Sequence, residues 1–336
     1  KQKTAYEITY GDWSSDVCSS DLVPSAKAIQ LDSMFGMHPS LSSLQPFWAS
    51  GNLAFVHAAG LPAPNRSHFS AMDELERAAP GTSARTGWLD RTIGLHTAGG
   101  PFGAIQLGST DIPESLAGPW PVLGMSSIDS FSLSSAGDAT SRARWATALN
   151  AFHNHAPAEL ADTAATTLSA LDTAATLAAG TYTPGNGATY PNSDLGKALS
   201  DSAQLIKANV GTRVITIDQG DWDMHSGLGP VDYGWMHDNL NNLGDALAAF
   251  ATDLGTAMSS VTLVTISEFG RRVQENASGG TDHGHGNMML VMGGHVAAKS
   301  VLTQWPGLAP EKLVNGDLAI TIDYRDVLGE IVSTRL

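Results

Sequence analysis

The chain has 336 residues, a length that suits one large α/β domain as well as two smaller ones. Its 33 acidic and 18 basic side chains give a formal net charge of −15 at pH 7, which repels polyanions and excludes nucleic acid as a partner. No apolar stretch of about 18 residues exists to span a bilayer, and a single cysteine, Cys18, excludes an intramolecular disulfide and a thiolate metal cage.

The beginning of the chain has the sequence of a cloning or sequencing scar. Residues 12–22 match the translation of a common sequencing adapter, and the alternative is an ordinary loop rich in Ser and Asp. We therefore expect residues 1–22 to be non-native or disordered. A helical pattern over residues 323–332 stops close to the last residue. The prediction is a single α/β domain over residues 23–336, truncated at both ends.

The first half of this domain contains one clear strand and one clear helix start. Residues 53–59 form a short apolar run between Gly51 and Gly60, which is typical of a buried strand in a parallel sheet. A loop of Pro, Asn and Ser then leads into acidic residues, which predicts a helix beginning near Ser67. Residues 141–179 are rich in Ala, Thr and Leu at helical spacing and predict two helices, and residues 181–194 predict an exposed loop.

Strands and helices alternate in the second half. The pattern predicts helices over residues 195–208 and 236–254, and strands over residues 213–217, 261–266, 288–292 and 318–322. Such alternation is typical of a parallel sheet covered by helices. Ligands bind at the carboxyl edge of such a sheet, so the residues that directly follow a strand are candidates for binding or catalysis.

Acidic residues and one histidine follow the strand over residues 213–217. They include Asp218, Asp221, Asp223 and His225. In an extended backbone, residues two apart project to the same face, so Asp223 and His225 can reach one ion. The alternative is a polar turn. A second strand end carries Glu268 as a candidate ligand and Arg271 as a candidate anion holder, with a surface salt bridge as the other role for the arginine.

The strongest local pattern surrounds one aspartate and two histidines with glycines. Asp282, His283 and His285 lie within four residues, and the neighbouring glycines let backbone approach a ligand closely. Together with Asp223, His225 and Glu268, these residues predict a divalent-metal site. Mixed carboxylate and imidazole ligands suit zinc, which is the first choice, or manganese or iron.

Ser67 is a candidate nucleophile at the start of the predicted helix. A helix N-terminus directs N–H groups at a bound anion, and Arg66 and His68 flank the hydroxyl. We therefore include Ser67, Arg66, His68 and Arg271 as candidate catalytic residues. The alternative is that Ser67 caps the helix and His68 packs against the core.

With these residues, the sequence resembles the bacterial domain-of-unknown-function 1501 family, over about residues 29–332. The motifs that carry the resemblance are FGMHPSL (35–41), FVHAAG (55–60), RSHFSAMD (66–73), GWLDR (87–91), WDMHS (222–226), SEFGR (267–271) and GTDHGHGN (280–287). The family usually has GGWDTH where this chain has QGDWDMH, so Asp221 is an extra acid, either a further ligand or a solvated neighbour.

This resemblance implies an alkaline-phosphatase/sulfatase type of fold, a three-layer α/β domain with a mostly parallel central sheet. It implies that Asp223, His225, Asp282 and His283 are metal ligands, that Ser67 is the nucleophile, and that the protein is exported by the twin-arginine route to the periplasm or the cell exterior. The predicted function is metal-dependent hydrolysis of a small anionic ester, a phosphate or a sulfate. The alternatives are an exported binding or assembly module with a structural metal, and a hydrogen-bonded acidic network without metal.

Overall fold

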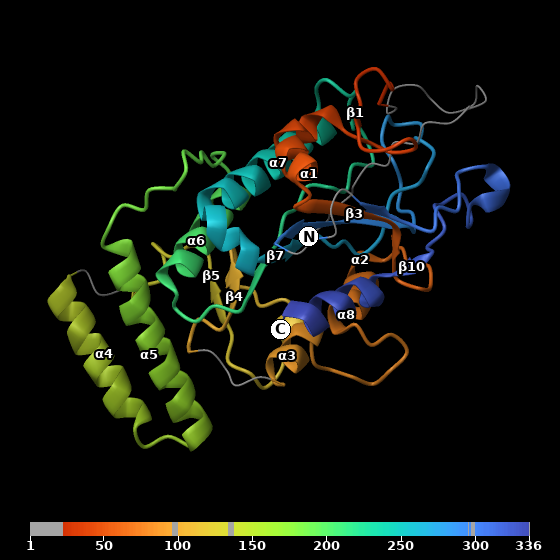
Figure 1. Cartoon of the computed structure of the whole chain (residues 1–336). Helices are drawn as coiled ribbons and strands as arrows, with labels where there is room; N and C mark the ends of the chain where they lie inside the picture. Colours follow the sequence, from red (N-terminus) through yellow and green to blue (C-terminus); the bar gives the residue numbers. More distant parts are fainter. Residues whose placement is uncertain (1–22, 96–99, 134–137, 295, 297–299, 336) are drawn as a thin grey trace. The chain divides into compact units, whose positions relative to one another are not determined.

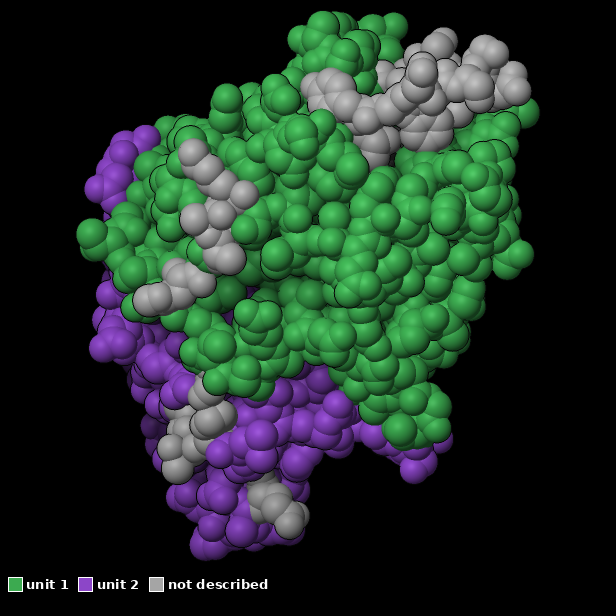
Figure 2. Space-filling view, turned by 45° about the vertical axis from the view of Figure 1, so that its right-hand side comes forward, with its two compact units in different colours: residues 1–82, 188–191, 219–336 green, residues 83–187, 192–218 purple. Residues whose placement is uncertain are grey.

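The structure is a computed structural model that describes residues 23–95, 100–133, 138–294, 296 and 300–335. Helices and strands both contribute to a mixed α/β fold (Figure 1). The chain divides into two compact units (Figure 2): unit 1 contains residues 1–82, 188–191 and 219–336, and unit 2 contains residues 83–187 and 192–218. The adapter-like segment and the rest of residues 1–22 lie outside the described residues. The single domain expected over residues 23–336 stays a prediction.

Unit 1 is built on a mixed sheet whose central strand is β3 (Leu53–Gly60). All eight residues of β3 are buried, as the uninterrupted apolar run predicts. On one side β3 pairs antiparallel with β8 (Asn287–Gly293), which pairs antiparallel with β7 (Thr262–Val264). On its other side, β9 (Val301–Leu302) and β10 (Ile322–Asp323) pair parallel with β3.

The direction of β8 differs from the mostly parallel sheet that the sequence predicts. Parallel neighbours need a crossover, usually a helix, and the connection over residues 265–286 contains no helix, so the chain returns antiparallel. The three-layer, mostly parallel arrangement therefore does not describe this sheet. The strand expected over residues 318–322 is also shorter, because only Ile322 and Asp323 pair with β3.

The helices of unit 1 follow from apolar periodicity. α7 (Trp235–Leu254) begins one residue before the predicted start and ends at the predicted residue, and its buried side chains recur at helical spacing. It packs on the 3-10 helix η1 (Pro39–Leu44). The remaining elements of unit 1 are β1 (Ile29–Gln30), β2 (Gly36–Met37), α1 (Gln45–Ser50), α2 (His68–Arg77), η3 (Gly255–Ser260), η4 (Pro310–Lys312) and α8 (Tyr324–Arg335).

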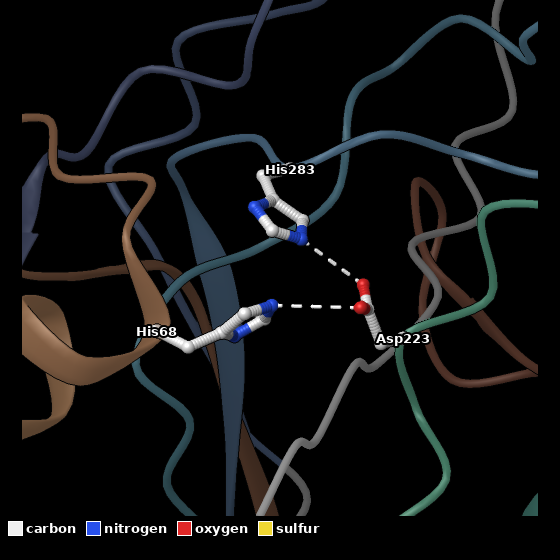
Figure 3. A group of neighbouring side chains, drawn as sticks. All are labelled: His68, Asp223 and His283. Atoms are coloured by element: carbon white, nitrogen blue, oxygen red, sulfur yellow. Dashed lines mark hydrogen bonds and ion pairs between the residues drawn. The ribbon is translucent and has the colours of Figure 1, made fainter.

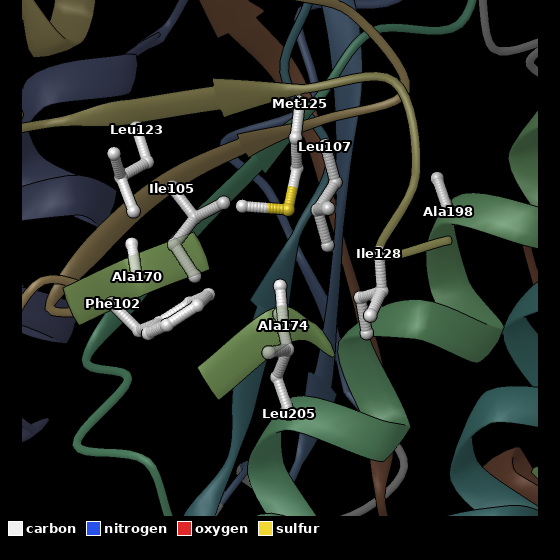
Figure 4. Packing of buried hydrophobic residues seen from close by; sticks show 10 residues of the cluster. All are labelled: Phe102, Ile105, Leu107, Leu123, Met125, Ile128, Ala170, Ala174, Ala198 and Leu205. Carbon is white, nitrogen blue, oxygen red and sulfur yellow. The ribbon is translucent and has the colours of Figure 1, made fainter. Parts of the chain in front are cut away.

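Unit 2 contains a small parallel sheet of β5 (Leu123–Met125), β4 (Ala104–Leu107) and β6 (Val214–Ile217), with β4 in the centre. Side chains of this sheet pack with α5 (Ala158–Ala178) and α6 (Asp194–Ala208) in one apolar cluster, shown in Figure 4. The two helices predicted over residues 141–179 are α4 (Ala139–His153) and α5. Unit 2 also contains α3 (Trp88–Ile93) and η2 (Glu114–Leu116). The predicted parallel pairing is therefore present in this unit.

Candidate metal centre

Three separate segments of unit 1 bring histidines and carboxylates together. His68 is the first residue of α2. Asp223 and His225 lie in the segment that precedes α7, and His283 lies in the connection between β7 and β8. In the segment around Asp223, Trp222 and Met224 are buried, whereas Asp223 and His225 project to the opposite side. This alternation is the one that an extended backbone predicts.

Glycines allow these segments to approach closely. A Cβ atom at Gly280 would overlap the backbone of Met224 and His225, and one at Gly284 would overlap the backbone of Arg271. The resulting contacts include a Thr281 amide that donates to the Met224 carbonyl at 3.0 Å. Gly280 and Gly284 therefore allow close backbone packing around the site, and the ligand approach that the sequence suggested stays a prediction.

Asp223 is the centre of the cluster. Its Oδ1 lies 2.8 Å from His225 Nε2 and 3.0 Å from His283 Nε2, and the two ring nitrogens are 2.9 Å apart. Ligands on a tetrahedral zinc, at about 2.0–2.1 Å from the ion, would be about 3.3 Å from one another. Small side-chain movements would therefore place these three atoms around one ion.

His68 approaches the same carboxylate from α2, as Figure 3 shows. Its Nε2 lies 3.6 Å from Asp223 Oδ2. Ligand atoms of His68, Asp223 and His283 all lie within 4.8 Å of one another, which makes these three residues a possible metal-binding group. The buried ring of Phe269 packs against both imidazoles, with ring centroids 4.8 Å from His68 and 4.7 Å from His283.

The three histidines have the same hydrogen-bonding arrangement. Each Nδ1 faces an oxygen: Glu268 Oε1 at 2.9 Å for His68, Asp282 Oδ1 at 2.9 Å for His225, and the Arg66 carbonyl at 2.8 Å for His283. Carboxylates and carbonyls only accept, so a proton on each Nδ1 would satisfy these oxygens and would leave the lone pair of each neutral ring on Nε2. All three lone pairs then face Asp223. In that tautomer a cation between the three Nε2 atoms and the carboxylate would be bound by all of them.

The ionisation of Asp223 agrees with a role as an anionic ligand. Burial alone would raise its pKa, but the hydrogen bond and the positive charge of Arg271 oppose burial, and the pKa is lowered to about 2. Arg271 Nη1 donates to Asp223 Oδ1 at 2.6 Å, and Nη2 donates to the Thr281 carbonyl. The guanidinium expected to hold a substrate anion is thus nearly buried and binds the central carboxylate instead.

Glu268 and Asp282 stand behind histidines, on the side opposite to the shared carboxylate. Glu268 is buried and also accepts from the Ser267 hydroxyl. Asp282 accepts from Asn276 as well as from His225, and these hydrogen bonds, that of His225 first, lower its pKa. Both carboxylates, predicted as direct ligands, contact the Nδ1 atoms of His68 and His225, a position that is usual for carboxylates that orient metal-binding histidines.

His285 differs from the other predicted ligands. It is buried, and its charged neighbours are Asp317 and Arg66. Burial, followed in size by the opposing effects of Asp317 and Arg66, lowers its pKa. His285 thus lies beside an ion pair formed by Arg66 and Asp317.

Ser67 and the acids around Asp221 lie in simpler surroundings. Ser67 is the residue before α2, its side chain is exposed, and it makes no capping hydrogen bond. The structure thus gives no support to a capping role for this hydroxyl. Asp221 has an exposed side chain and a φ of 67°, so it is a solvated neighbour of the cluster. Asp218 belongs to unit 2, where its carboxylate accepts from Gln106.

Two roles could not be read from the sequence. His68, predicted as a catalytic neighbour of Ser67, belongs to the group that could hold a metal ion. Its position beside Arg66 and Ser67 in one motif indicated a functional residue, but it did not indicate a metal ligand. Asp317 had no signal, since it follows Gly316 in a region without other acids nearby, and only the fold brings it to Arg66.

The fold and this cluster define the chain as a mixed α/β protein with an Asp/His group suited to a divalent metal. The model of the family described as "Protein of unknown function (DUF1501)" matches residues 14–327, so the chain belongs to this family. Neither a curated protein nor a solved structure matches the chain. In the part of the chain that the structure describes, no helix combines the length and the apolarity that a membrane crossing requires.

Proposed function

We propose that this protein is a metal-dependent hydrolase of small phosphate or sulfate esters and that zinc is held by Asp223, His283 and His68, with His225 as a further ligand. The observation that carries the proposal is the arrangement of the three histidines. Each has its Nδ1 at an acceptor and its Nε2 towards Asp223, an arrangement in which three Nε2 lone pairs can bind one ion. A divalent ion would supply Lewis acidity and would stabilise the charge that develops on the ester oxygens.

The residues of the chain have distinct roles in this proposal. Ser67 Oγ attacks the phosphorus or sulfur atom and the bond to the ester oxygen breaks; the alcohol leaves with the hydroxyl proton. Water then cleaves the covalent intermediate and releases phosphate or sulfate. Support for Ser67 comes from its exposed side chain and its place directly before His68 at the start of α2. Arg271 holds Asp223 ionised and in place.

The relationship to alkaline phosphatases and sulfatases, and export to the periplasm or cell exterior, form part of the same proposal. They rest on the motif resemblance, because the sheet of unit 1 has β8 antiparallel to both neighbours. Cell fractionation of the native gene product would test the predicted location.

The test is metal analysis combined with ester cleavage. We expect the chain to retain zinc through dialysis and to cleave 4-nitrophenyl phosphate or 4-nitrophenyl sulfate. We expect a chelator to remove both properties and added zinc to restore them. His283→Gln should lose zinc, and Ser67→Ala should keep zinc but lose at least about 100-fold in kcat. A chain that binds no divalent transition metal would contradict the proposal.

A second candidate is a non-catalytic exported binding or assembly module that retains a structural metal. The hydrogen bonds of Arg271 to Asp223 and to the Thr281 carbonyl favour it, because they occupy the guanidinium that was expected to hold a substrate anion. In this case zinc is retained, no ester is cleaved, and Ser67→Ala has no effect on any measured property.

A further inference from the structure

Asp317 has a fully buried carboxylate that belongs to no predicted site. Its side chain is 0% exposed, and its Oδ2 accepts from both Nε, at 3.1 Å, and Nη2 of Arg66. Its Oδ1 has no hydrogen-bond partner among the described residues, and Arg272 Nε lies 4.0 Å from it. Burying a charge with incomplete hydrogen bonding costs stability, so stability alone does not account for an acid at this position.

Arg66 connects Asp317 to the metal centre. The side chain of Arg66 binds Asp317, and the main-chain carbonyl of Arg66 accepts from His283 Nδ1 at 2.8 Å. The backbone beside Asp317 is also tied to the segment of His283, because the Gly286 amide donates to the Leu318 carbonyl at 2.9 Å. Asp317 therefore anchors the residue that sets the tautomer of His283.

The other two histidines make the same connection directly. Glu268 accepts from His68 Nδ1, and Asp282 accepts from His225 Nδ1. His283 Nδ1 faces the backbone carbonyl of Arg66 in place of a carboxylate, and the side chain of the same arginine binds Asp317. Each imidazole of the cluster is thus supported by a carboxylate, two of them by contact and one through Arg66.

We propose that Asp317 is a positioning residue of the metal centre: through Arg66 it fixes the orientation and tautomer of His283, and so sets the affinity for the metal. This inference rests on the proposed metal site. Partners that stand behind a metal-binding histidine change metal affinity by about 10- to 100-fold when they are removed. A buried ion pair that only stabilises the fold would change the unfolding of the metal-free chain and leave the affinity of the folded chain unchanged.

The experiment compares zinc affinity by competition with a chromophoric chelator, on the full chain, for wild type, Asp317→Asn and Asp201→Asn. Asp201 is a matched control, since it is equally buried, binds Lys197 and lies in unit 2. We expect the zinc Kd of Asp317→Asn to rise about 10- to 100-fold and that of Asp201→Asn to stay within about twofold of wild type. The visible spectrum of the cobalt-substituted protein should change in Asp317→Asn and stay unchanged in the control.

The possible results of this zinc-affinity experiment separate failure of the metal site from failure of the role of Asp317. A wild type that binds no zinc refutes the metal site itself. If wild type binds zinc and Asp317→Asn binds it equally well, Asp317 has no positioning role. Should Asp317→Asn fail to fold, Arg66→Lys decides by the same measurement, because lysine keeps the charge beside Asp317 but cannot make the two-pronged contact. A zinc Kd of Arg66→Lys equal to that of wild type then overturns the inference.

Discussion

At the scale of single residues, Asp223 determines the chemistry of the cluster. Its Oδ1 lies within 3.0 Å of a guanidinium nitrogen and of two imidazole nitrogens. Because the pKa of this carboxyl is lowered to about 2, the carboxylate is ionised wherever the chain is folded near neutral pH. In the proposed site this carboxylate would therefore offer the ion an oxygen that is already ionised.

The low pKa of Asp223 predicts a defined loss of stability in acid. The folded pKa lies below the unfolded value of 3.8, so the ionised carboxylate stabilises the fold above about pH 4, and this stabilisation is lost as the pH falls towards 2. We expect Asp223→Asn to lower the unfolding free energy of the metal-free chain by a constant amount from pH 7 to about 4, and by less as the pH approaches 2. Urea denaturation in the presence of a chelator measures this difference.

Asp221→Asn is the control for that series, because Asp221 is an exposed acid two residues away and asparagine tolerates its positive φ. Its unfolding free energy should follow wild type at every pH. A difference between Asp223→Asn and wild type that stays constant down to pH 2.5 would show that the charge of Asp223 is not stabilised by Arg271.

At the scale of elements, the sequence predicts local structure better than pairing. The start of α2 at His68 and the buried strand β3 follow from a Pro-, Asn- and Ser-rich loop that precedes acidic residues and from an apolar run, which are local signals. The antiparallel direction of β8 depends on how residues 265–286 return to the sheet, and no local pattern encodes it. The same difference applies to the site. Asp223, His225 and His283 lie in short motifs that the sequence shows directly, whereas Asp317 reaches Arg66 only through the fold.

The approach between two loop segments of the site predicts an effect of adding one methyl group. A Cβ at Gly280 would overlap the backbone of Met224 and His225, which cannot move without shifting a candidate ligand. We expect Gly280→Ala to cost about 1–3 kcal/mol of stability and to weaken zinc binding. The measurements are thermal unfolding of the metal-free chain and zinc titration of the folded one.

Gly220→Ala provides the comparison for this substitution, since a Cβ at Gly220 would meet no atom within 4 Å. It should leave both properties unchanged. Equal behaviour of the two alanine variants would mean that the segments of Gly280 and His225 do not pack as closely as the structure has them.

At the scale of the whole molecule, the candidate ligands join parts of unit 1 that lie far apart in the sequence, around residues 68, 223 and 283. An ion that binds the folded chain and not the unfolded chain stabilises it by about 2.7 kcal/mol at a concentration 100 times its Kd. The net charge of −15 also attracts any divalent cation without specificity, so total binding alone does not identify a site.

Hydrogen exchange separates these two effects. Several amides connect the segments that carry the ligands, among them Thr281 to the Met224 carbonyl, Arg272 to the Asp282 carbonyl and Gly284 to the Gly270 carbonyl. We expect zinc at saturating concentration to slow exchange most in peptides that contain these amides, because opening any of them would separate the ligands. Helix α4, which has no buried residue, should exchange equally fast with and without zinc.

Magnesium at the same concentration serves as the control for charge attraction, since it prefers oxygen ligands. Equal protection by both ions, or protection by zinc that does not favour these segments, would place the bound metal elsewhere than at Asp223.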